Sequence, residues 1–561
     1  MAESSSRAKF YSWFLLLIAG LGGLLYGIDV GIIAAALLYL SKTINLTVEQ
    51  TSFIVAAVLG GSMFSSLVAG VLADLFGRKS LMIVSGLMFV ASVGLIVLSQ
   101  GFLPLFLGRL LQGMSGGVIA VVVPLYLAEC LRADQRGRGT ALFQFMLTFG
   151  IVCAAVTGWF YTQQAEHAIT AAAGNADLIR AAQNHAWRGM FFAVIYPGLL
   201  FFFGAFFLSE SPRWLLLRGR FDAALAALRR SAPEEQAQLE LAEMQQLALQ
   251  NKKEASHAAS SLLRRKYIVP FVLACAIMTL NQTTGINSIL PYSVIILRQA
   301  GMSAAHATQG DVTVKVLNCV MTLIAVALVD KKGRTFLLRI GTAGIVVALL
   351  AGGLFFVGIE SKRVDVRDKV DAAKSGNTVN LSLSSPALGV VPTAGRTMAL
   401  TVLYSYGKGD HIVTVLSDEP KPVLSLQPDA ADAGAPLRIR RAFYAPVPTE
   451  AAGWLITACL VLFISCYAAG PGVVVWLALS ELMPTRIRSI GMGFSLLLNQ
   501  GAATLIAAVF LPVVGNYGYS VMFFFLAGCT VFYFLTAAFF LPETKGKTLE
   551  EIEMHFDRSR A

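Results

Sequence analysis

Charge is scarce in this chain. Of its 561 residues, 14% are Asp, Glu, Lys or Arg, whereas about a quarter of a soluble domain is charged. Hydrophobic residues make up 56%, and they come in blocks of about twenty, the length that crosses a bilayer as a helix. This composition excludes an ordinary cytosolic enzyme, a disordered chain and a nucleic-acid-binding domain. It predicts an all-α polytopic membrane protein.

Groups that carry catalysis or hold cofactors are also missing. The seven cysteines lie in apolar segments, and none has the Cys-x-x-Cys spacing of zinc sites and redox motifs. The Gly-x4-Gly-Lys-Ser/Thr loop that cradles nucleotide phosphates is absent, and so is any recognisable nucleophile–base pair. We therefore expect no enzyme, no metal, no cofactor, no nucleic-acid partner and no ATP-driven pump.

Twelve apolar segments are present, each long enough to cross a hydrocarbon core of about 30 Å. Because lipid offers no hydrogen-bond partner to the backbone, these segments should be helices. They are 11–40, 51–73, 80–99, 104–128, 140–161, 188–208, 268–298, 310–329, 336–358, 453–479, 489–512 and 519–541.

Two long polar stretches interrupt this series. Residues 209–266 are rich in Ala, Leu, Glu and Gln and predict a linker of short amphipathic helices. Residues 360–450 contain alternating apolar and polar runs, which predict a small β-rich insert. The helices are expected at Phe221–Arg230 and Pro233–Gln250, and the strands at Thr397–Tyr406 and His411–Leu416. The expected units are 1–208, 209–266, 267–541 interrupted by 360–450, and a tail at 542–561.

The distribution of Lys and Arg predicts the orientation. With both termini in the cytoplasm, 27 of the 44 basic residues lie on that side, as the positive-inside rule requires. Five lie in short outside loops and helix ends: Lys42, Arg180, Arg188, Arg298 and Lys315. The linker is then cytoplasmic and the insert lies outside. The insert's composition is typical of a protein of the bacterial inner membrane.

Loop signatures recur in the two halves of the chain. Three matches in the same order indicate two pseudo-symmetric six-helix bundles, an architecture of duplicated transporters. Their charged members predict an intracellular ion-pair network that closes an inner gate in one state; they could alternatively serve only as topology signals. These residues are Asp74, Arg78, Lys79, Glu129, Arg136, Glu210 and Arg213 in the first half, and Asp330, Arg334, Glu481 and Arg488 in the second.

The motifs resemble those of the sugar porter family of the major facilitator superfamily, which includes bacterial proton–sugar symporters and animal glucose facilitators. The resemblance covers the chain except 360–450. It is carried by Gly22-Gly23-Leu-Leu-Tyr26-Gly27-Ile-Asp29, Pro124-Leu-Tyr126-Leu-Ala-Glu129, Gly285-Ile-Asn287 and Gly470-Pro-Gly472 followed by Trp476. Departures at Asn281-Gln282, Pro291-Tyr292, Ala468 and Asn499-Gln500 leave the solute open.

Asp29 is the only carboxylate well inside the first apolar segment, and Arg109 lies in the fourth. Because a lone charge costs about 2.5–3.5 kcal/mol to bury on insertion scales, Arg109 is the expected partner. In proton-coupled members of the family the matching pair is the proton switch. Near Arg⁺ the carboxylate keeps its charge, and when the pair separates it takes up a proton. The alternative is a static ion pair that orients two helices.

The expected solute site consists of amides, because an amide offers the donor and the acceptor that sugar hydroxyls need. The resemblance places Gln144, Gln282, Asn287, Asn318 and Asn499 around a central cavity. Gln282 and Asn287 are five residues apart, so a helix break near Gly285 is expected to bring them to one side. Trp476 would stack on a pyranose face. The alternatives are hydrogen bonds between helices for the amides and packing for the tryptophan.

The combined expectation is a secondary transporter of a sugar or polyol that works by alternating access, with protons as the coupling ion and Asp29 as their site. A monomer is sufficient for this mechanism. Three alternatives stay open: an uncoupled facilitator, a transporter of another small organic solute, and a nutrient sensor that does not transport.

Overall fold

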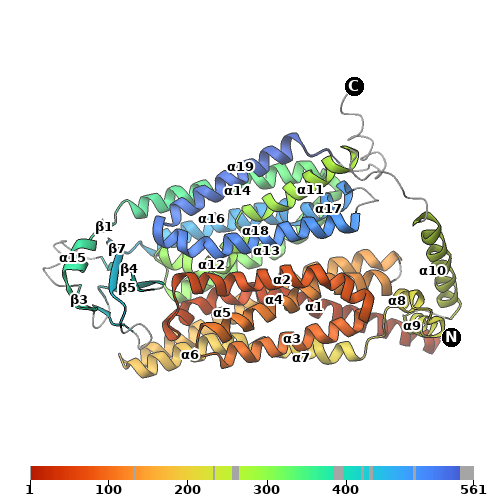
Figure 1. Cartoon of the computed structure of the whole chain (residues 1–561), viewed down its shortest axis with the longest axis horizontal. Helices are drawn as coiled ribbons and strands as arrows, with labels where there is room; N and C mark the ends of the chain where they lie inside the picture. Colours follow the sequence, from red (N-terminus) through yellow and green to blue (C-terminus); the bar gives the residue numbers. More distant parts are fainter. Residues whose placement is uncertain are drawn as a thin grey trace.

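The chain folds into one elongated bundle of helices with a small β-structure at one end (Figure 1). The computed structural model describes residues 2–131, 133–231, 234–255, 265–383, 396–407, 409–418, 422–428, 434–483 and 488–543. Within these residues, 12 helical segments are long and apolar enough to cross a membrane. Each coincides with one of the predicted apolar segments, so the twelve-span prediction is confirmed.

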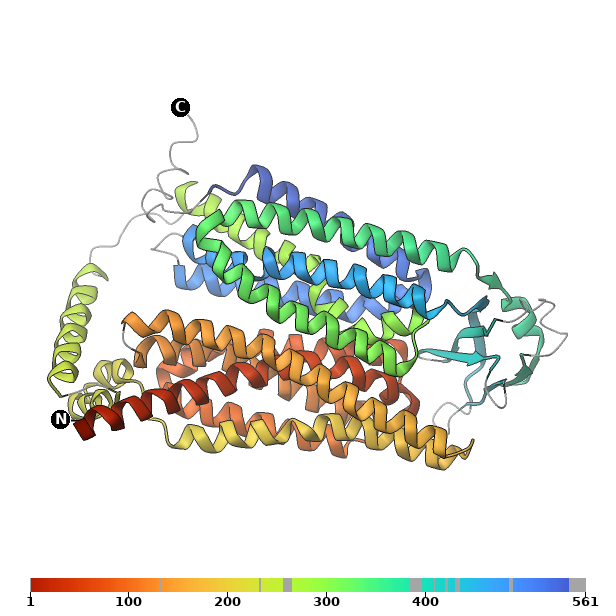
Figure 2. The same cartoon turned by 180° about the vertical axis from the view of Figure 1, so that it is seen from behind.

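The spans form two halves that lie side by side, the first half red to yellow and the second green to blue (Figures 1 and 2). The first half contains α1 (Ala2–Thr43), α2 (Val48–Phe76), α3 (Arg78–Leu98), α4 (Phe102–Cys130), α5 (Ala133–Ala171), α6 (Ala176–Ala193) and α7 (Ile195–Phe206). The second contains α11 (Arg265–Thr283), α12 (Ile286–Gln299), α13 (Ala304–Lys332), α14 (Arg334–Glu360), α16 (Glu450–Ala469), α17 (Pro471–Leu482), α18 (Arg488–Tyr517) and α19 (Tyr519–Phe539). Between the halves, α1 packs on α12, α2 on α18 and α5 on α13.

The predicted break in span seven is present. The α11 helix ends at Thr283 and α12 begins at Ile286, with Gly285 between them at φ +84°. A side chain is disfavoured at that φ, and a Cβ on Gly285 would lie 2.5 Å from Leu526 Cδ1. Both the backbone conformation and the close packing therefore require glycine. Span ten is interrupted in a similar way at Gly470, between α16 and α17.

Helices α3 and α14 share an unusual start. Gly77 and Gly333 precede them at φ +94° and +90° and provide no capping side chain. The first N–H groups are bound instead by distant carboxylates: Glu210 accepts from Arg78 N over 2.9 Å and Glu543 from Arg334 N over 3.0 Å. A Cβ on either glycine would collide with that carboxylate. The carboxylates supply the acceptors that a local N-cap usually gives, and this arrangement is called the remote cap below.

Three helices follow the first half at one end of the bundle, which is called the linker end. They are α8 (Pro212–Leu217), α9 (Phe221–Ser231) and α10 (Glu234–Ala255). The last two coincide with the predicted amphipathic helices, and α8 precedes them. Leu215, Leu216 and Ala224 form a small buried cluster between α8 and α9. In Figures 1 and 2, α10 stands beside the bundle at this end.

The opposite end, called the insert end, carries a β-structure between α14 and α16. Its elements are β1 (Val364–Asp365), α15 (Arg367–Ala372), β2 (Lys374–Ser375), β3 (Thr378–Ser382), β4 (Met398–Tyr406), β5 (Asp410–Leu416), β6 (Val423–Leu426) and β7 (Leu437–Pro446). The strands form two antiparallel sheets, in the orders β1-β7-β4-β5 and β2-β3-β6. Alternating residues such as Leu400, Val402 and Tyr444 make a separate core. The β-rich prediction is confirmed.

The insert belongs to the second half by sequence but also contacts the first. Asp410 at the start of β5 donates its N–H to Glu49 Oε2 on α2 over 3.4 Å. Next to it, a Cβ on Gly409 would lie 2.3 Å from Thr47 Cγ2. The insert therefore touches both halves at this end of the bundle.

Candidate functional site

Asp29 and Arg109 form an ion pair in the interior of the first half. Arg109 Nη1 lies 3.1 Å from Asp29 Oδ1, and both side chains are 1% exposed. The same nitrogen donates to Gln112 Oε1 over 2.7 Å, and the guanidinium lies over the ring of Phe191. Asp29 Oδ2 is buried and has no hydrogen-bond partner among the described residues. The pair predicted from the sequence is thus formed, with one carboxylate oxygen left unoccupied.

Three of the predicted amides meet in the second half. Asn287 Nδ2 donates to Gln282 Oε1 over 2.8 Å, which joins α12 to α11 across the break at Gly285. Gln282 Nε2 donates in turn to Asn499 Oδ1 over 3.0 Å, and Asn499 Nδ2 to Met278 O over 2.8 Å. We call Gln282, Asn287 and Asn499 the amide chain. Only Asn287, at its end, is partly exposed.

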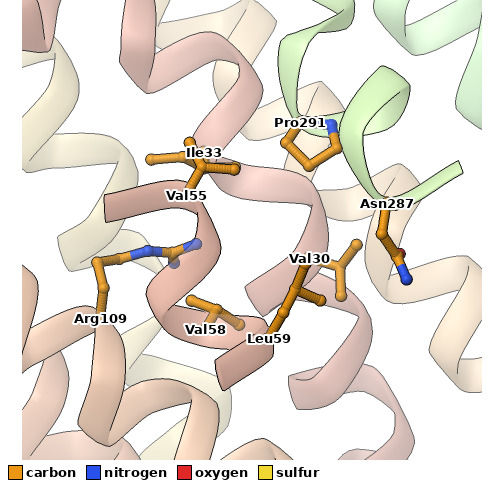
Figure 3. A pocket seen from close by; sticks show the side chains of 8 residues that line it. All are labelled: Val30, Ile33, Val55, Val58, Leu59, Arg109, Asn287 and Pro291. Carbon is orange, nitrogen blue, oxygen red and sulfur yellow. The ribbon is translucent and has the colours of Figure 1, made fainter. Parts of the chain in front are cut away.

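A small pocket between the halves connects the ion pair with the amide chain. Its volume is about 10 Å³, close to the smallest space that holds one water molecule. It is lined by Arg109 from the first half and Asn287 from the second. Figure 3 shows these two side chains on opposite sides, with Val30 and Leu59 between them. The remaining lining residues are apolar: Ile33, Val55, Val58 and Pro291. The pocket therefore has a cation at one wall and a hydrogen-bonding amide at the other.

The other predicted solute ligands lie outside this group. Gln144 on α5 is half-buried and Asn318 on α13 is buried, and neither side chain has a hydrogen-bond partner among the described residues. Trp476 on α17 is 45% exposed and has no ring partner in the part of the chain that the structure describes. Their part in binding stays a prediction.

At the linker end, the charged residues of the first half form a network. Arg78 is buried and binds Asp74 over 2.9 Å and Glu129 over 2.9 Å. Glu210 accepts from the N–H groups of Arg78 and Lys79. Each of these contacts lies within the first half. Arg213 is exposed on α8, and the described residues give it no ion-pair partner.

The second half repeats this network with the matching residues. Arg334 lies 3.0 Å from Glu481, and Glu543 accepts from the N–H groups of Arg334 and Thr335. Arg78, Glu129, Glu210, Arg334 and Glu481 were among the charged residues singled out from the sequence, whereas Glu543 was not among the predicted gate residues. Arg136, Asp330 and Arg488 lie in α5, α13 and α18, but their side chains fall outside the described residues. Closure of a gate by these charges stays a prediction.

The sequence reasoning missed a second ion pair within the membrane. Lys315 was assigned to the outside loops and helix ends, but this is wrong: α13 begins at Ala304, and Lys315 lies eleven residues into it with 0% of its side chain exposed. Its Nζ lies 2.7 Å from Asp311 Oδ2. The signal was available, because Asp311 and Lys315 are four residues apart and face one another on a helix.

Known proteins agree with this architecture. The family described as "Sugar (and other) transporter" matches residues 15–376 and 439–556, so the gap falls within the insert. The glucose transporter GlcP of Staphylococcus epidermidis is 26% identical over 547 residues, 97% of each chain. The human proton myo-inositol cotransporter is 27% identical over 578 residues, 99% of this chain and 84% of its own.

Among solved structures, the xylose transporter XylE from E. coli in a partially occluded inward open conformation has a TM-score of 0.67. It is 20% identical and the match covers 96% of this chain and 99% of that one, so it supports the fold. The family match begins within the first span and includes the other eleven, and its internal gap lies in the insert. The chain is therefore a membrane transporter of the sugar porter family of the major facilitator superfamily.

Proposed function

We propose that this protein carries a sugar or polyol into the cell together with a proton, by alternating access. The observation that carries the proposal is the buried Asp29–Arg109 pair with its unoccupied Oδ2. A carboxylate inside a membrane protein is costly and usually functional. Here it has one oxygen held by Arg109 and another that can accept a proton without displacing a protein partner.

The proton step follows from the geometry of the pair. While Arg109 stays 3.1 Å from Asp29, the carboxylate keeps its charge. If the helices rock and the two groups part, an unpaired carboxylate in a dry interior is unfavourable and takes up a proton. When the pair forms again, the proton leaves from the other side. Because α1 and α4 both belong to the first half, a small shift between them would suffice.

The amide chain is the proposed solute site. Sugar hydroxyls both donate and accept, and the amides of Gln282, Asn287 and Asn499 do the same. A sugar that replaced the bond between Asn287 and Gln282 would keep every amide satisfied. The glucose and myo-inositol relatives support a polyhydroxy solute. We further propose the linker end as the cytoplasmic side and the insert as extracytoplasmic.

Uptake into proteoliposomes tests this proposal. Labelled xylose, glucose, galactose and myo-inositol are offered with and without an inward proton gradient, to the unaltered protein, to Asp29→Asn and to Asp177→Asn. Asp177 is an exposed carboxylate at the start of α6 and is the matched control. We expect gradient-driven accumulation in the unaltered protein and in Asp177→Asn, and only downhill exchange in Asp29→Asn.

Two outcomes would contradict the proposal. Equal, gradient-independent flux in all three proteins would exclude proton coupling and would indicate an uncoupled facilitator. Absence of flux for all four compounds, with the protein folded, would remove these sugars as solutes and favour another solute or a sensor.

A further inference from the structure

The Asp311–Lys315 pair has no part in the proposed proton site or solute site. Both side chains lie on α13 and are almost fully buried, and Nζ of Lys315 is 2.7 Å from Oδ2 of Asp311. Charges inside a membrane protein are rare because they are expensive, and they are by default functional. A pair of well-packed apolar residues would be no less stable at such a place, so stability alone does not account for it.

The carboxylate of Asp311 is anchored within the second half. Ser293 on α12 donates its hydroxyl to Oδ1 over 2.5 Å, while Oδ2 accepts from Lys315. Both oxygens are therefore occupied, by groups on two helices that pack together. An anchored carboxylate fixes where the ammonium group of Lys315 lies.

The ammonium group of Lys315 forms a hydrogen bond with the first half. Its Nζ donates to the carbonyl oxygen of Gly31 on α1 over 3.0 Å. Gly31 lies two residues beyond Asp29 toward the insert end. It packs so closely on α5 that a Cβ would be 2.8 Å from Ala154 Cβ. The bond therefore joins the second half to the tightly packed α1–α5 pair.

This bond is stronger than neutral contacts that also cross between the halves. Thr148 Oγ1 reaches Cys319 Sγ at 3.5 Å, and Gln500 Nε2 reaches Ser62 Oγ at 3.4 Å. A hydrogen bond from an ammonium is roughly twice as strong as a neutral one. The bond to Gly31 is also shorter than both.

We infer that Lys315 is a positioning residue of the transport cycle, one that holds the halves together on the insert side of the pocket and is released each time that side opens. Asp311 and Ser293 keep the ammonium aimed at Gly31 O. The inference rests on alternating access, which is part of the proposed function, but on neither the identity of the solute nor proton coupling.

Hydrogen–deuterium exchange of the purified full-length protein, without sugar and at constant pH, tests the inference. In Lys315→Met we expect faster exchange at the insert ends of α1 and α12, together with slower exchange at the linker ends of α4 and α18. Loss of one charge-assisted bond should shift the equilibrium between the two access states about tenfold. A change of access state speeds exchange at one end and slows it at the other, whereas loosened packing would only speed it.

Two variants serve as controls. Lys315→Arg keeps a cation within reach of Gly31 and should restore the original pattern. Val316→Met changes the exposed neighbour on α13 and should leave exchange unchanged. If Lys315→Met does not fold, Lys315→Gln is measured by the same criteria.

Faster exchange at both ends, or an unchanged pattern in a folded Lys315 variant, would overturn the inference. Because the readout contains no uptake, failure of the sugar or proton proposal would leave this result intact.

Discussion

The two halves of the bundle make matching contacts at the linker end, but they bury different polar side chains in their interiors. At the linker end, each half has an arginine that binds a glutamate of a neighbouring span, and each has a remote cap. Inside, the first half buries the Asp29–Arg109 charges, whereas the second buries the amide chain. The repeated features are those that hold helices in place. The features that differ include those that we propose bind a proton or a solute.

Under the proposed function, the first half binds the proton and the second half binds the solute. The Asp311–Lys315 pair belongs to neither task, since it contacts the opposite half. The insert is the other large difference, because the first half has no counterpart between α3 and α4.

The largest expected effect is a fall in transport efficiency when the amide chain is broken, compared with the loss of an amide outside it. Gln282→Ala removes the bonds to both Asn287 and Asn499, so we expect kcat/KM for the transported sugar to fall about 10- to 100-fold. Gln144→Ala, which breaks no described side-chain bond, should cost less. Initial uptake rates over a range of sugar concentrations measure both. An unchanged KM with a lowered melting temperature in Gln282→Ala would make the amide chain a structural element only.

A comparable effect, on stability and not on uptake, tests the equivalence of the two remote caps. Gly77→Ala and Gly333→Ala force a side chain into a backbone region reserved for glycine and against Glu210 or Glu543. Each should lose about 1–3 kcal/mol of stability. Gly101→Ala is the control, since a Cβ there meets nothing within 4 Å. Thermal unfolding in detergent measures the three. A loss in one half alone would break the equivalence.

The smallest effect concerns the insert. Burial raises the pKa of the Asp410 carboxyl, Glu49 raises it further, and Arg440 and His411 act against this. A carboxyl with a raised pKa binds its proton more tightly in the folded protein. It therefore adds stability as the pH falls through that pKa toward the ordinary value of about 3.9, and the gain is lost as the pH rises.

Asp410→Asn should make the stability of the insert less dependent on pH above the ordinary carboxyl pKa of about 3.9, as followed by amide exchange of β4 and β5. Asp368→Asn, at an exposed carboxylate on α15, should keep the original dependence. An identical pH profile for all three proteins would show that Asp410 does not titrate in this range.

The sequence predicts the local features well, because hydropathy and periodicity act over a few turns. All twelve spans, two of the linker helices and the two main strands follow from such patterns, whereas the break at Gly285 was expected from the positions that the family resemblance gives to Gln282 and Asn287. Lys315 was counted as lying at a helix end because the predicted apolar segment starts at residue 310. The helix α13 itself starts earlier, at Ala304, so Lys315 lies deeper in it. Among contacts between distant residues, the cost of burying a lone charge predicted the Asp29–Arg109 pair, and the other predicted contacts depended on the family resemblance. Nothing local indicates that Gln282 meets Asn499, 217 positions away, or that Glu543 caps α14.

The remote caps also bear on how the protein is made. The acceptor for the first N–H groups of α3 comes from a residue 132 positions later, and that for α14 from one 209 positions later. While the ribosome is still producing the intervening spans, these helix starts have no partner from the protein. The remote cap of each half can therefore form only after its sixth span has been synthesised.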